Sequence, residues 1–240
     1  MLENGPDGLF IAEGDEERRL GKDGTQTKRA ILDAAEQLVF RRGFAASSVD
    51  DVIAAAGVTK GAFFHHFRTK AELGQALVER FARRDRAHLE RNLARAERLA
   101  GDPLMQLLLL VGLFEEDIES LGSEIPGCLF ACYIYEAQLF DARTLDIVAK
   151  GLLAWRDLLR PKFEAAIRNC EPQRLVTPDE LADQLLATIE GAMILGRSHR
   201  DPTLLPRQLR QYRNYLELLF ARWMPAKAVP NDLALADAER

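Results

Sequence analysis

Hydroxyl side chains stand at three points near the N-terminus where helices are expected to begin. They belong to Ser47, Ser48, Thr59 and Thr69. Serine and threonine at these positions accept hydrogen bonds from the free amides of a first helical turn. Helix starts also carry partial positive charge and favour phosphate groups. Lysine directly follows two of the threonines, so this stretch predicts contacts with a phosphate backbone.

The apolar residues between these caps predict two short helices joined by a turn. The first is expected over Val49–Ala56 and the second over Lys60–His66, with Gly57-Val58-Thr59 between them. This is the helix-turn-helix arrangement, whose second helix enters the DNA major groove. Phe63 and Phe67 lie one turn apart and are expected to anchor the second helix to a core.

The other face of the second helix is left for the duplex. Gly61 and Ala62 remove side-chain bulk, so the helix can approach the base edges, while lysine supplies charge for the backbone. The predicted DNA contacts are Ser47, Ser48, Thr59, Lys60, Gly61, Ala62, Phe64, His65 and Lys70.

The histidines and cysteines do not form a recognisable metal site. His65 and His66 are adjacent, and neighbours on a helix point about 100° apart, which makes a poor chelating pair. The cysteines, Cys128, Cys132 and Cys170, are odd in number and lack a CxxC spacing, which argues against disulfides and cysteine zinc sites. We expect no metal and no cofactor.

Helical periodicity continues beyond this unit, and no segment shows sustained strand-like alternation. Further helices are expected at about 25–42, 70–99, 104–121, 128–140, 143–169, 178–197 and 203–223. The chain is therefore predicted to be all-α. The expected parts are a flexible arm (1–24), a helix-turn-helix domain (25–72), a larger helical bundle (73–223) and a polar tail (224–240).

Composition fits a globular protein that is not basic overall. The 240 residues are 48% hydrophobic and carry a net charge of −5. Charge is uneven, because residues 25–72 carry +2 and the rest carries −7. The longest apolar run, Leu104–Phe114, is too short to span a membrane, and the N-terminus lacks the pattern of a secretion signal. We expect a cytoplasmic protein.

Residues 25–73 resemble the DNA-binding domain of the TetR family of bacterial transcriptional regulators. The matching stretches are Gly43-Phe44, Ser48-Val49-Asp50-Asp51-Val52, Ala55-Ala56-Gly57-Val58-Thr59-Lys60-Gly61, Phe64-His65-His66-Phe67 and Lys70-Ala71-Glu72-Leu73. The resemblance implies that the helix from Lys60 binds operator DNA. This family commonly has tyrosine at position 64, and phenylalanine keeps the ring but cannot hydrogen-bond a phosphate.

The resemblance also implies a small-molecule effector within the C-terminal bundle, and a homodimer formed through helices 178–197 and 203–223. Apolar stripes on these two helices, from Leu181 to Leu195 and from Leu209 to Trp223, suit either a dimer contact or an internal core. The candidate pocket residues are Phe114, Cys132, Tyr135, Glu136, Trp155, Phe163 and Met193. Ligand pockets and ordinary cores share this mixture of groups.

The predicted function is a DNA-binding transcriptional regulator, a repressor released from its operator by a small ligand. Cys128 and Cys132 lie one helical turn apart, which keeps a thiol-based redox sensor as an alternative. A helical adaptor without DNA binding is a second alternative, favoured only by Phe64. An enzyme is not expected, since no phosphate-binding glycine loop, HExxH or GxSxG is present.

Overall fold

The computed structural model describes residues 22–123 and 127–221, and within these ranges every regular element is helical. The helices are α1 (Lys22–Arg42), α2 (Val49–Ala56), α3 (Lys60–His66), α4 (Lys70–Leu99), α5 (Pro103–Glu119), α6 (Leu129–Tyr135), α7 (Ala142–Asn169), α8 (Pro178–His199) and α9 (Leu204–Leu219). A short 3₁₀ turn, η2 (Ala137–Leu139), follows α6. The all-α prediction is confirmed.

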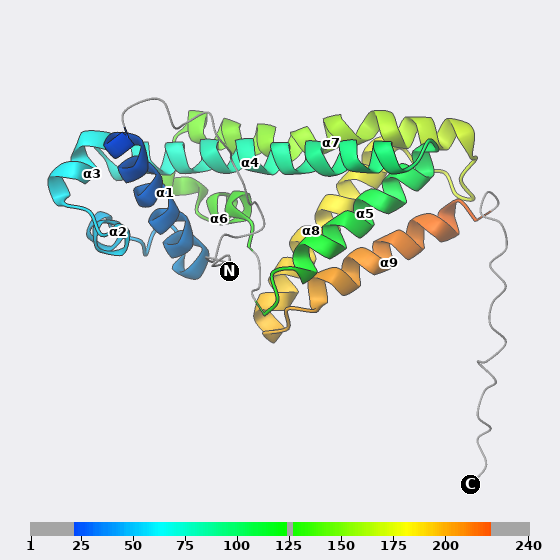
Figure 1. Ribbon diagram of the computed structural model, residues 1–240. Coiled ribbons are helices and arrows are strands. Elements are labelled where there is room, and N and C mark those ends of the chain that lie inside the picture. Colours follow the sequence, from blue (N-terminus) through cyan, green and yellow to red (C-terminus); the bar gives the residue numbers. More distant parts are fainter. Residues whose placement is uncertain (1–21, 124–126, 222–240) are drawn as a thin grey trace, which may run out of the picture.

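The molecule is elongated, with α1, α2 and α3 gathered at one end (Figure 1). The long helix α4 runs from that end beside α7, and α5, α8 and α9 fill the opposite part of the molecule. Helix α6 lies between the two groups. The α2–α3 unit is thereby held apart from the C-terminal bundle.

Two apolar cores lie along α4. One joins α1, α2, α3, α6 and the first turns of α4 around Phe63, Leu77 and Tyr133. The other joins the remaining turns of α4 to α5, α7, α8 and α9 around Leu89 and Phe163. Since α4 contributes to both cores, a displacement of this helix in one half would be felt in the other.

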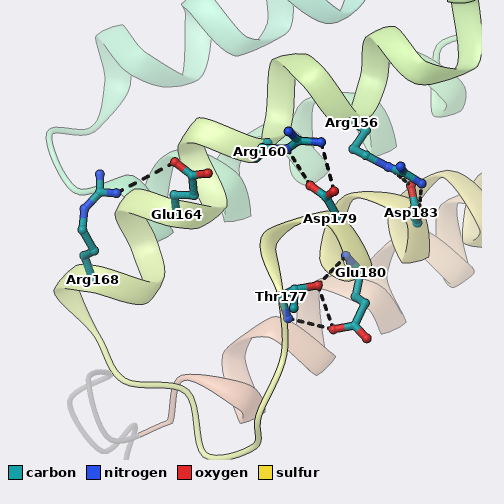
Figure 2. Close-up of polar contacts among 8 residues, drawn as sticks. All are labelled: Arg156, Arg160, Glu164, Arg168, Thr177, Asp179, Glu180 and Asp183. Carbon is teal, nitrogen blue, oxygen red and sulfur yellow. Dashed lines mark hydrogen bonds and ion pairs between the residues drawn. The ribbon is translucent and has the colours of Figure 1, made fainter.

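Ion pairs link α7 to α8 on the outside of the bundle. Arg156 holds Asp183, and Arg160 holds Asp179, each through two hydrogen bonds of 2.5–2.9 Å (Figure 2). The Thr177–Glu180 capping box satisfies the amides of both residues at the start of α8. Paired guanidinium–carboxylate contacts fix orientation, so α8 is held in register against α7.

Several boundaries differ from the sequence prediction. Helix α1 begins at Lys22, so the last residues of the predicted arm are helical, while residues 1–21 lie outside the described residues. The helix expected to reach Phe140 ends at Tyr135, because Glu136 leaves helical geometry with φ −113° and ψ 28°. Trp223 and the predicted tail, 224–240, also lie outside the described residues.

The apolar stripes of the last two helices are core of the same chain. Leu181, Leu185 and Leu209 are each about 1% exposed and pack against α5 and α7. Among the stripe residues that the structure describes, only Leu195 departs from this pattern, since it lies on the exposed side of α8. Of the two alternatives for these stripes, internal core therefore holds for the described residues, and a dimer contact through these two helices stays a prediction.

Candidate functional site

The first helix of the helix-turn-helix unit, α2, is capped at both ends. The Ser48 hydroxyl oxygen accepts a hydrogen bond from the Asp51 amide at 3.1 Å, and the Asp51 carboxylate accepts from the Ser48 amide at 3.0 Å. The hydroxyl and amide of Ser48 lower the pKa of Asp51. Gly57 ends α2 at φ +64°, a conformation that favours glycine. The turn therefore has one defined geometry.

Helix α3 is anchored on one side and open on the other. Thr59 caps it by accepting the Ala62 amide at 3.1 Å. Phe63 and Phe67 are buried, as predicted, and the Phe63 ring lies edge-on to Phe64. Because both anchors lie on one face, the opposite face of the helix is free to meet a duplex.

The outward face of α3 has the predicted composition. Lys60, Gly61, Phe64 and His65 are exposed, and Phe64 keeps 42% of its surface in solvent. The Lys60 ammonium lies 3.5 Å from Asp50, and both side chains are largely exposed. Exposed pairs of this kind contribute little energy, so Lys60 can exchange Asp50 for a phosphate.

Two predicted DNA contacts point inward instead. The Ser47 hydroxyl is buried and donates to the Gly43 carbonyl at 2.7 Å. The Lys70 ammonium donates to the carbonyls of Phe44 and Ala45 at 2.7 and 3.2 Å, and burial lowers its pKa. These side chains stabilise the loop before α2, while Ser48, Thr59, Lys60, Gly61, Ala62, Phe64 and His65 stay as predicted contacts.

The loop after α1 is held by a carboxylate from the other half of the chain. Glu136 accepts hydrogen bonds from the amides of Phe44 at 2.7 Å and Ala45 at 3.2 Å. Gly43 has φ +83°, and a Cβ there would lie 2.7 Å from the Glu136 carboxylate. We call this contact the Glu136 clamp. It corrects the prediction that Glu136 faces an effector pocket, because its carboxylate is already bonded at the boundary between the two halves.

Removing the clamp is expected to destabilise the protein. Glu136→Ala leaves two amides without their acceptor, and the free energy of unfolding should fall by about 2 kcal/mol. Urea denaturation measures this change. Gln138→Ala, an exposed side chain in the adjacent turn, is the control and should change stability little. Equal free energies of unfolding for Glu136→Ala and the control would show that the clamp does not stabilise the protein.

A cavity lies within the C-terminal bundle and encloses about 580 Å³ of empty volume, part of it open to solvent. Its lining comes from α4 to α9, and the residues are Phe81, Asp85, His88, Phe114, Ile118, Gly127, Cys128, Phe130, Leu152, Trp155, Leu186, Ile189, Glu190, Met193, Leu205 and Leu209. The mainly apolar lining with few polar groups is typical of small-molecule sites.

The polar groups of the cavity come from α4, α7 and α8 and from Cys128, directly before α6. The Trp155 indole donates to the Asp85 carboxylate at 2.8 Å. Burial raises the pKa of Asp85 to about 6, against the effect of the Trp155 hydrogen bond. Burial also raises the pKa of Glu190, and it raises the pKa of the Cys128 thiol well above its usual value. The His88 ring nitrogen Nε2 lies 3.2 Å from the Asp117 carboxylate.

Three of the seven predicted pocket residues line this cavity, namely Phe114, Trp155 and Met193. The others lie elsewhere. Phe163 is fully buried in the core, Cys132 packs with the N-terminal core, and Tyr135 is 72% exposed. Helix α6 turns its Tyr135 face to solvent, which the sequence pattern alone did not reveal.

Sequence reasoning missed the acidic pair of the cavity, Asp85 and Glu190. A usable signal was present, because Asp85 stands one turn after Phe81 and one turn before Leu89 on the buried stripe of α4. A carboxylate in an apolar stripe needs a partner. Glu190 follows the buried Ile189. From the sequence alone, its half-buried position could not be distinguished from that of an ordinary polar residue at the edge of an apolar helix face.

The buried Asp85 carboxylate should make stability fall as pH rises. Its pKa is about 6 in the folded state against an ordinary 3.8, so the folded state binds more protons between these values. Asp85→Asn removes this cost and should raise the free energy of unfolding by about 3 kcal/mol at pH 7.5, with most of the gain lost at pH 4. Urea denaturation of wild type and variant at both pH values measures it. Asp146→Asn, at the surface of α7, is the control. A gain that is no larger at pH 7.5 than at pH 4 would contradict the placement of this charge.

Both halves of the chain match profiles of one family. A profile described as bacterial regulatory proteins, tetR family, matches residues 31–77. A second, described as the tetracyclin repressor-like C-terminal domain, matches residues 113–212. The first covers α2 and α3, and the second covers α6, α7 and α8 and most of the residues that line the cavity.

Individual relatives agree with these profiles. The HTH-type transcriptional repressor DhaR of Mycobacterium sp. strain GP1 is 28% identical over 181 residues, 74% of this chain and 85% of the relative. The transcriptional regulator AcuR of Cereibacter sphaeroides is 28% identical over 185 residues, 75% of this chain and 80% of the relative. A TetR-family regulator from Agrobacterium tumefaciens, of known crystal structure, is 25% identical with a TM-score of 0.66, covering 80% of this chain and 98% of that one.

No helix among residues 22–123 and 127–221 has the length and apolarity needed to cross a bilayer. The same ranges hold no group of three His, Cys, Asp or Glu side chains placed to bind a metal ion. With an exposed recognition helix at one end, a cavity in the other half and matching profiles over both, the chain belongs to the TetR family of DNA-binding transcriptional regulators.

Proposed function

We propose that this regulator is a cytoplasmic repressor that binds its operator as a homodimer through α3 and leaves it when a small effector enters the cavity. The observation that best supports this proposal is the position of α3. The helix is anchored on one face and exposes Lys60, Gly61, Phe64 and His65 on the other. The family to which the chain belongs acts by binding rather than by catalysis.

The proposed dimer contact is the outward face of α8, with Leu218 from α9. This face is set by residues spaced three and four apart, and they are Gln184, Ala187, Thr188, Gly191, Ile194, Leu195 and Ser198. A Cβ added at Gly191 would meet nothing within 4 Å, so a partner helix can approach there closely. Small and apolar side chains in one exposed stripe are typical of a helix-packing surface.

Effector binding can reach the DNA-binding half through α6. Phe130, near its start, lines the cavity and packs edge-on against Phe81 of α4 at a ring distance of 4.9 Å. Tyr133 donates to the Gly74 carbonyl at 2.6 Å, and the Glu136 clamp follows at its end. A ligand that displaces Phe130 therefore shifts a helix whose other end holds the loop before α2.

The thiol alternative is less favoured. Thiol reactivity depends on the thiolate form, and burial raises the pKa of both Cys128 and Cys132. These cysteines therefore have the character of unreactive packing residues. Neither supports a redox sensor as well as the cavity supports an effector.

Fluorescence anisotropy with DNA from upstream of the protein's own gene tests this function. We expect sequence-specific binding that weakens linearly with the logarithm of salt concentration, and release on addition of compounds found in a thermal-shift screen. Binding equal to that of a scrambled duplex of the same length would reject the proposal.

A further inference from the structure

The cavity lining contains two acidic side chains, Asp85 and Glu190, which we call the acidic pole. The proposed release mechanism does not by itself require them. Asp85 lies on α4 and Glu190 on α8, and they are close enough that charge on Glu190 contributes to the raised pKa of Asp85. Both carboxyl groups lie mostly buried, where an unbalanced negative charge is unfavourable.

Among the described residues, histidine is the one basic residue type in the cavity lining, and the charge of His88 lowers the pKa of Asp85 against the effect of burial. Neither lysine nor arginine is among the cavity-lining residues in the described part of the chain. His88 lines the cavity, but its Nε2 atom lies 3.2 Å from Asp117. Arg197, beside Gly127, donates to the Phe40 carbonyl at 2.8 Å and is not a lining residue.

Four aromatic side chains also line the cavity, together with aliphatic ones. The indole of Trp155 donates to Asp85 and stacks on Phe114 at a ring distance of 5.4 Å. Phe81 and Phe130 also line the cavity. Ring faces attract cations as well as hydrocarbon, so this lining suits an apolar body that carries one positive charge.

We propose that the cavity binds a monocationic, largely apolar amine, with its ammonium group between the carboxylates of Asp85 and Glu190 and its hydrocarbon against Phe114 and Trp155. This inference rests on the proposed function, since it names the chemical class of the effector. The amine adds positive charge to a pole whose lining has two carboxylates and one histidine, and an anionic ligand of equal size is disfavoured.

A series that differs only in its charged end tests the proposal. The probes are 4-phenylbutan-1-amine, 4-phenylbutan-1-ol and 4-phenylbutanoate, measured against wild-type protein by isothermal titration calorimetry at pH 7.5. The amine should bind about 10-fold to 100-fold more tightly than the alcohol, the ratio given by one charge-assisted hydrogen bond. The carboxylate should bind most weakly.

Variants locate the binding. Asp85→Asn and Glu190→Gln keep the side-chain shapes, and each should reduce amine affinity by about 10-fold while leaving alcohol affinity within about 2-fold. Asp146→Asn removes an exposed carboxylate of α7 away from the cavity lining and should leave amine affinity unchanged. Circular dichroism melts confirm that each variant is folded.

The amine proposal is overturned if the amine does not bind, if the alcohol or carboxylate binds as tightly, or if both cavity variants keep full amine affinity. Operator binding by unliganded wild type is measured in parallel. Operator binding without amine selectivity would reject only the effector class, whereas loss of specific operator binding would reject the proposed function itself.

Discussion

Ile194→Arg is expected to convert the protein to a monomer and to weaken operator binding by about 100-fold or more. Ile194 is 49% exposed on the outward face of α8, where the proposed two-fold contact brings the same face of both subunits together. Two introduced guanidinium groups would then face each other, and like charges across an interface cost several kcal/mol. Light scattering after gel filtration measures the mass, and anisotropy measures the affinity.

Leu153→Arg provides the matched control for this prediction. Leu153 is 47% exposed, so the change in surface chemistry is the same, but it lies on α7 outside the proposed contact. It should stay dimeric and bind operator normally. A dimeric Ile194→Arg protein, or a monomeric Leu153→Arg protein, would place the subunit contact elsewhere.

Lys60→Ala should weaken operator binding by about 100-fold, because a two-fold dimer loses the contact twice at about 10-fold each. Lys60 begins α3, and its exposed ammonium lies 3.5 Å from the Asp50 carboxylate. A plot of the logarithm of affinity against the logarithm of salt concentration should also become less steep, by the amount expected for about two lost phosphate contacts per dimer. Anisotropy at several salt concentrations measures both quantities.

Lys150→Ala is the control for the charge itself. Lys150 is an exposed lysine of α7 that pairs only weakly with Asp146, and α7 is not part of the helix-turn-helix unit. Removing it changes net charge equally and should leave the affinity and the salt slope unchanged. Equal losses of affinity in both variants would indicate a general effect of net charge and would contradict a specific DNA contact by Lys60 of α3.

Much of the fold was predictable because its signals are local. Ser48, Thr59 and Thr177 cap helices where the sequence indicates, and the bounds of α2 and α3 are confirmed. A hydroxyl before an apolar helical pattern acts within one turn of its own position, so sequence suffices. The burial of Phe63 and Phe67 follows from their spacing in the same way.

Features that depend on partners far along the chain were not predictable. Glu136 reaches the amides of Phe44 and Ala45 across more than 90 residues, and Lys70 turns to the same loop. Asp85 meets Trp155 across 70 residues. Periodicity indicates which face of a helix is apolar, but the element that covers a polar residue is set by the packing of all the helices together.

The most direct measurement is a hydroxyl-radical footprint of the wild-type protein on the DNA upstream of its own gene. A two-fold dimer that places one α3 in each half-site predicts two protected segments with centres about one helical turn, roughly 10 base pairs, apart, and protection that disappears at high salt. No protection at any protein concentration, or protection spread evenly along the fragment, would contradict sequence-specific binding by α3.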